Sequence, residues 1–84
     1  MTLRDRIELA LIAQGERVHT KTSKYLVLTR AKGGFYFVGK SGGLRAGRTA
    51  SSSFTLTHTP FYKQLIAYQP TIGDILKLSP EPTL

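Results

Sequence analysis

The stretch that decides the fold is Lys24-Tyr-Leu-Val-Leu-Thr-Arg-Ala-Lys-Gly-Gly-Phe-Tyr-Phe-Val38. Residues 24–30 and 35–38 are rich in β-branched and aromatic side chains, a composition that is typical of strands. Residues 31–34, between them, carry two glycines and predict a tight turn. The stretch therefore predicts an antiparallel hairpin.

Shorter segments on both sides of this hairpin extend the predicted sheet. Residues 17–20 read as a short strand, and residues 44–49 read as another strand after a glycine turn at 41–43. The three serines at 51–53 predict a polar loop or a bulge. Because the joins are short and carry glycine, we expect an antiparallel meander of three to four strands.

An amphipathic helix is predicted over residues 3–14, where apolar side chains recur at helical spacing. Thr2 precedes it as a capping residue, and Gly15 follows it as a left-handed stop. This spacing places Arg4 and Glu8 on the solvent side of the helix. Its apolar stripe is wide enough to cover one face of a sheet.

A second helix is predicted over residues 60–68, because a capping threonine followed by proline typically starts a helix. Residues 71–78 fit either a last strand or a helical turn capped by Thr71. The sequence thus predicts an α+β fold, with a small antiparallel sheet and two short helices packed on one face. Residues 1–78 form the single domain, and the proline-rich residues 79–84 form a C-terminal tail.

The charge of the chain is strongly positive and unevenly placed. Twelve Lys and Arg residues against five Asp and Glu residues give a formal net charge of +7. No acid occurs from Arg17 to Gly73. That region holds nine bases, namely Arg17, Lys21, Lys24, Arg30, Lys32, Lys40, Arg45, Arg48 and Lys63. Charge of one sign repels itself, and a polyanionic or acidic partner relieves that repulsion.

Catalytic and metal-binding motifs are weak in this sequence. Residues 34–41 match the phosphate-loop pattern, but their variable positions are Phe-Tyr-Phe-Val, which favour a strand, and Gly42-Gly43 opens no helix. The chain has no cysteine, and neither His19 nor His58 has another ligand at metal-binding spacing. We therefore predict a protein that is not an enzyme and needs no metal or cofactor.

The most informative segment is 39–53, where three bases, four glycines and five hydroxyl side chains occur together. Arginine forks match phosphate or carboxylate oxygens, and hydroxyls add contacts that are blind to base sequence. Strand alternation puts Arg45 on one face, with Leu44 and Ala46 on the other. A solvated hairpin that binds nothing is the alternative reading of this segment.

The aromatic residues suggest a second, weaker signal. Alternation places Phe35 and Phe37 on one face, which we assign to the core, and Tyr36 on the other. Tyr25 and Tyr36 could stack on bases, as on sheets that bind single strands. Packing in the core or at the sheet edge is the favoured role for both.

Residues 36–53, Tyr-Phe-Val-Gly-Lys-Ser-Gly-Gly-Leu-Arg-Ala-Gly-Arg-Thr-Ala-Ser-Ser-Ser, resemble a segment of small uncharacterised proteins of tailed bacteriophages and prophages. The shared pattern is an aromatic strand, a glycine turn, Leu-Arg-x-Gly-Arg-Thr and a serine-rich end. The resemblance implies a phage accessory protein that acts on nucleic acid or on a host complex, or a minor virion component. It implies no activity and no site residues.

These observations predict a non-catalytic basic binding protein that contacts nucleic acid through phosphate. The alternative is a phage protein–protein module, such as an inhibitor or adaptor of a host complex or a minor virion component, with its basic surface against an acidic protein. The residues expected to bind either partner are Lys24, Arg30, Lys32, Lys40, Arg45 and Arg48.

The expected location is the cytoplasm, which is the host cytoplasm if a phage encodes the chain, with the virion as the alternative. Four charges in the first eight residues argue against a signal peptide. No run approaches the roughly 18 apolar residues of a membrane span, so no membrane partner is expected. The sequence leaves a homo-oligomer open.

Overall fold

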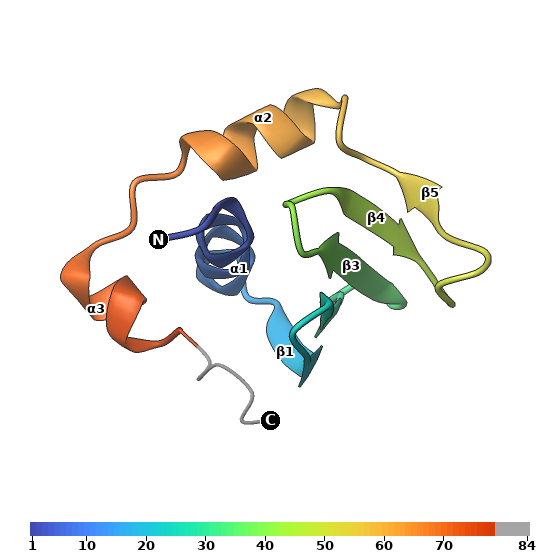
Figure 1. The fold of residues 1–84 in the computed structure, drawn as a ribbon, viewed down its shortest axis with the longest axis horizontal. Helices are drawn as coiled ribbons and strands as arrows, with labels where there is room; N and C mark the ends of the chain where they lie inside the picture. The colour runs from blue at the N-terminus through green and yellow to red at the C-terminus, as the bar shows by residue number, and fades with distance from the viewer. Residues whose placement is uncertain (79–84) are drawn as a thin grey trace.

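The computed structural model describes residues 1–78 as one antiparallel sheet with three helices. The sheet order is β1-β2-β3-β4-β5, and α1 and α2 lie on the same side of it (Figure 1). The helices are α1 (Leu3–Ala13), α2 (Pro60–Ala67) and α3 (Ile72–Leu76), and the strands are β1 (Arg17–Lys21), β2 (Tyr25–Thr29), β3 (Phe35–Gly39), β4 (Leu44–Gly47) and β5 (Phe54–Thr55). The predicted α+β class is confirmed, with one more short strand and one more short helix than expected.

The helix ends follow the predicted local chemistry. Thr2 and Asp5 form a reciprocal capping box at the start of α1, and Gly15 takes a φ of +102° directly after its C-cap. Thr59 caps α2, with Pro60 at its first position. For residues 71–78 the helical alternative is correct, because Thr71 and Asp74 form a second capping box before α3.

The β2–β3 and β3–β4 hairpins have loops of the same type. The amide of Gly33 donates to the carbonyl of Arg30, and the amide of Gly42 donates to the carbonyl of Gly39, both at 3.0 Å. Gly33 and Gly42 have φ values of +101° and +97°, which only glycine adopts freely. These left-handed residues close three-residue loops and fix the register of β2, β3 and β4.

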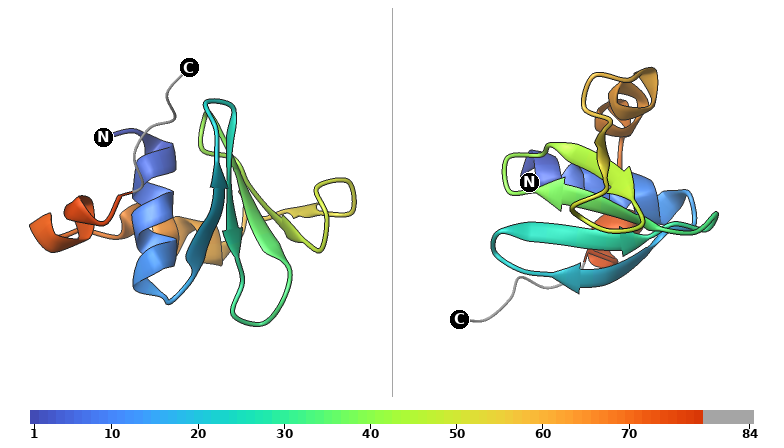
Figure 2. Two further views of the ribbon diagram at one scale, coloured as in Figure 1. Left: turned by 90° about the horizontal axis from the view of Figure 1, so that it is seen from below. Right: turned by 90° about the vertical axis from the view of Figure 1, so that its right-hand side faces the viewer.

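The hydrophobic core lies between the sheet and the helices, on one side of the sheet only. Buried apolar residues from the sheet and from the helices form one cluster: Ile7, Ala10, Leu11, Leu26, Leu28, Tyr36, Val38, Leu44, Ala46, Tyr62 and Leu65. The Tyr62 hydroxyl donates to the carbonyl of Gly42 at 2.7 Å, which ties α2 to the β3–β4 turn. No helix among residues 1–78 covers the opposite side of the sheet, as the left view of Figure 2 shows.

The predicted faces of β3 are wrong. Tyr36 is buried in the core at 8% exposure, whereas Phe35 and Phe37 lie half-buried on the uncovered side of the sheet. The register explains this, because Tyr36 pairs with Leu28 and cross-strand partners share a face. Tyr36 packs with stacked geometry on Phe61 of α2, with ring centroids 5.9 Å apart.

The predicted solvent side of α1 is also wrong. Arg4 and Glu8 are buried, because β1 packs against this side of the helix. Glu8 Oε1 lies 3.1 Å from Lys21 Nζ, and the Arg4 guanidinium donates to the carbonyl of Thr22 at 2.7 Å. Lys21 is therefore compensated inside the fold and is not part of the exposed positive charge. The predicted tail, 79–84, lies outside the described residues.

Candidate nucleic-acid interface

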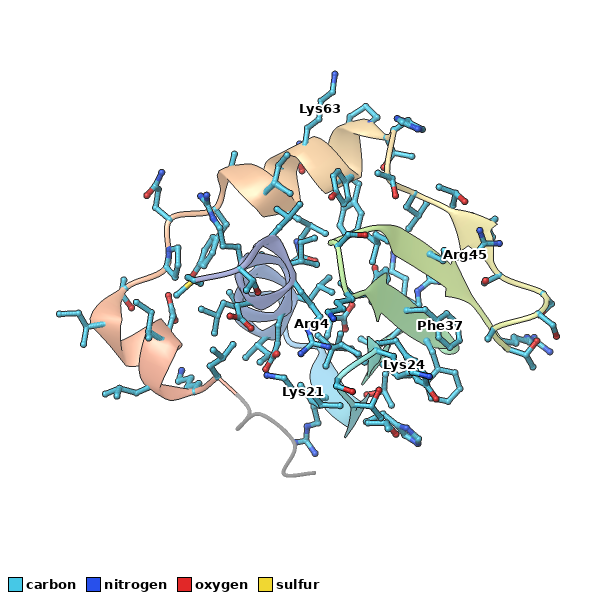
Figure 3. The ribbon with its side chains drawn as sticks, in the orientation of Figure 1. Arg4, Lys21, Lys24, Phe37, Arg45 and Lys63 are labelled. Atoms are coloured by element: carbon cyan, nitrogen blue, oxygen red, sulfur yellow. The ribbon has the colours of Figure 1, made fainter. Side chains whose placement is uncertain are left out.

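The side of the sheet that faces away from α1 and α2 carries the candidate site. We call it the open face, and its central side chains are Tyr25, Val27, Phe35, Phe37 and Arg45. A hollow of about 730 Å³ runs along it, from the β3–β4 turn to the β4–β5 loop. In Figure 3, Phe37, Lys24 and Arg45 lie on this side of the sheet, while Arg4 and Lys21 lie on the α1 side.

Aromatic rings form the floor of this hollow. The ring centroids of Phe35 and Phe37 are 6.2 Å apart, as expected for alternate residues of one strand. His19 meets Phe35 edge-on at 5.2 Å. His19 follows Val18, which pairs with the core residue Leu28, so strand alternation turns His19 toward the open face. The bulge between Val18 and Thr20 keeps Thr20 on this face as well and returns Lys21 to the helix side.

The guanidinium group of Arg45 is held in place beside this floor. Its Nε donates to Ser53 Oγ at 2.8 Å, and its two Nη atoms donate to Thr55 Oγ1 at 2.8 Å and to the carbonyl of Ser53 at 2.6 Å. Arg45 pairs with Phe37 across the strands and remains exposed. Each Nη keeps a further hydrogen, so the fixed group can still donate to an anion.

The other predicted site residues lie at the two ends of the sheet. At one end, Lys24 lies in the β1–β2 turn and Lys40 in the β3–β4 turn, and both are exposed. At the other end, Arg30, Lys32 and Arg48 line a second hollow of about 430 Å³. Arg48 borders both hollows.

The structure therefore brings Arg30, Lys32 and Arg48 together and separates them from Lys24 and Lys40. Arg30 reaches the helix side of the sheet at that end, because its guanidinium carbon lies 5.1 Å from the ring centroid of the core residue Tyr36. The other five residues make two basic ends joined by Arg45 along the open face, rather than one compact patch.

Carboxylates do not offset this charge. Among residues 1–78, none lines either hollow. Asp5 and Glu8 are buried on α1, and Asp74 belongs to α3. Glu16 accepts a hydrogen bond from the amide of Ala31 at 3.0 Å, next to the β2–β3 turn. Among the described residues, the Asp, Glu, Lys and Arg side chains that line the two hollows are therefore all Lys and Arg.

Other types of site are not indicated by the described residues. Residues 1–78 contain no cluster of His, Asp and Glu that could hold a metal ion. The segment that matches the phosphate-loop pattern is a strand followed by a hairpin turn, with no helix after Ser41. No helix within the described part of the chain is long and apolar enough to span a membrane.

Three features of the candidate site were not predicted from the sequence: the outward position of Phe35, that of Phe37, and the ring contact of His19. A signal for two of them was present. A three-residue loop at residues 31–33 pairs Leu28 with Tyr36, and this pairing places Tyr36 in the core with Leu28 and turns both phenylalanines outward. The bulge in β1, which places Thr20 beside His19 on the open face, has no comparable sequence signal.

Comparison with known proteins finds no matching family model, curated protein or solved structure. The resemblance of residues 36–53 to phage proteins therefore stays an expectation.

Proposed function

We propose that this chain is a non-catalytic nucleic-acid-binding protein that contacts the phosphate backbone through the open face. The observation that carries the proposal is the distribution of charge. Cations flank the open face at both ends, Arg45 lies between them, and no carboxylate from residues 1–78 lines the hollows. An extended polyanion can contact all three groups of cations at once, and each contact releases counterions.

The test is a fluorescence anisotropy titration of labelled nucleic acids of unrelated sequence at several salt concentrations. The logarithm of the association constant should fall linearly with the logarithm of the salt concentration. Lys40→Ala and Arg48→Ala should weaken binding to every sequence by similar factors. Each should lower the salt slope by roughly 0.7–0.9, because each removes about one phosphate contact.

Lys63→Ala is the matched control. Lys63 is exposed on α2 and points away from the sheet (Figure 3), so the variant should bind as the parent does. The proposal fails if the parent binds no DNA or RNA at low salt, or if Lys63→Ala weakens binding as much as the other two. Binding lost only toward one sequence would indicate base readout instead.

The protein–protein alternative predicts a different result. An interface with an acidic protein has an apolar centre and loses much less affinity as salt rises. No binding to nucleic acid, together with capture of an acidic protein that Arg48→Ala abolishes, would favour this alternative.

A further inference from the structure

Contacts with phosphate groups do not explain why the centre of the open face is aromatic. Its centre is aromatic and apolar, and one of its rings, Tyr25, is 49% exposed. Phe35 and Phe37 beside it are half-buried, and no helix of the described residues packs over them. Exposed apolar patches of this kind on a small protein typically mark binding surfaces.

We infer that the open face binds unpaired bases, so that the ligand is single-stranded nucleic acid. This inference rests on the proposed function and names the form of nucleic acid that the same site takes. Bases present flat π-surfaces, and rings on an open sheet stack on them with little dependence on sequence. In a duplex, those surfaces are already covered by neighbouring base pairs.

The sheet is open above Gly39. Gly39 lies directly across from Tyr25 and has no side chain. A Cβ atom placed on Gly39 would meet nothing closer than the carbonyl oxygen of Gly43, at 3.9 Å. A base could therefore lie over Gly39, bordered by Tyr25 on the neighbouring strand and by Phe37 two residues earlier on the same strand.

The size of the hollow also favours a single strand. A volume of about 730 Å³ is in the range of small-ligand sites and matches a few unpaired bases. Three rings along two strands would accommodate about two or three bases, the number that other aromatic sheet surfaces take. The cations at the two ends of the face then meet the flanking phosphates.

Arg45 completes this arrangement. Its three hydrogen bonds to β5 and the preceding loop fix the guanidinium next to Phe37 before any ligand arrives. A group that is already ordered loses less conformational entropy on binding. Its remaining hydrogens can donate to the phosphate of the nucleotide that stacks on Phe37.

The experiment compares single strands of DNA and RNA of about ten nucleotides with the duplex of the same sequence at one salt concentration. The single strands should bind more tightly than the duplex. Phe37→Leu should weaken single-strand binding by about fivefold or more, the lower end of one lost base stack. Its salt slope should stay that of the parent, because no phosphate contact is removed.

The control is Leu76→Ala. Leu76 is an 81% exposed apolar residue of α3 that lines neither hollow, so its loss should leave single-strand affinity unchanged. Gly39→Val provides a second test. Its Cβ meets no close contact and β-branched residues suit strands, so the variant should remain folded, fill the space over the strand and lose single-strand affinity.

The outcomes separate the inference from the function on which it rests. If duplex binds as tightly as single strand, or if Phe37→Leu and Gly39→Val both bind single strands as the parent does, the stacking inference is overturned. The phosphate-binding proposal would survive that result. Absence of any nucleic-acid binding would overturn both. Circular dichroism confirms that each variant is folded before its affinity is interpreted.

Discussion

The ion pair buried between α1 and β1 offers a sharp test of how this small fold is held together. Lys21 Nζ lies 3.1 Å from Glu8 Oε1, and the two side chains are 5% and 0% exposed. We expect Glu8→Leu to destabilise the protein by about 3–5 kcal/mol, because it leaves an ammonium group buried without this carboxylate. A domain of 84 residues has a total stability of roughly 4–13 kcal/mol, so the loss would be a large part of it.

The double variant Glu8→Leu with Lys21→Met separates the pair from its surroundings. Apolar replacements for a buried pair are often neutral or stabilising, so the double variant should be more stable than Glu8→Leu alone. The assay is urea unfolding at neutral pH, followed by circular dichroism, for the parent, both single variants and the double variant. A Glu8→Leu loss below about 1 kcal/mol, or a double variant no more stable than the singles, would refute this reasoning.

Two further predictions concern the core and the C-terminal helix. Leu11→Ala and Leu65→Ala should each cost about 2–4 kcal/mol in urea unfolding, because both side chains are fully buried in the cluster that joins the helices to the sheet; a loss near zero for either would contradict this packing. Two hydrogen bonds lower the pKa of Asp74 below its ordinary value of 3.8. The larger effect comes from the Tyr68 hydroxyl, which donates at 2.6 Å, and the smaller effect comes from the Thr71 amide. The stabilisation from these bonds is therefore present above about pH 4 and lost as pH falls toward the lowered pKa of Asp74. The protection factors of the α3 amides, which are corrected for the intrinsic pH dependence of exchange, should therefore fall on acidification, and Tyr68→Phe should reduce this pH effect.

Local structure could be predicted well from the sequence. The caps at Thr2 and Thr59, the left-handed stop at Gly15 and the glycine turns depend on neighbouring residues only. The alternation in the central hairpin indicated strands for the same reason. β5 was missed because it has only two residues, too few to show any alternation.

The sequence shows where the charges lie along the chain, but it does not show which of them are exposed to solvent. Lys21 counted among the nine bases between Arg17 and Gly73, yet Glu8 compensates it inside the fold. Lys24, Lys40 and Arg48 remain exposed because they lie in turns and loops. Only packing distinguishes these cases, since it decides which side chains lose contact with water.

What the sequence by itself determined was that β3 has two faces, one with Phe35 and Phe37 and one with Tyr36. What the tertiary structure decided was which face meets the helices. Alternation is symmetric with respect to the two sides of a sheet, so hydrophobicity alone favoured burial of the two phenylalanines. The pairing of Tyr36 with Leu28 and its stacking on Phe61 settled the choice, because a strand takes its orientation from the neighbours with which it shares a core.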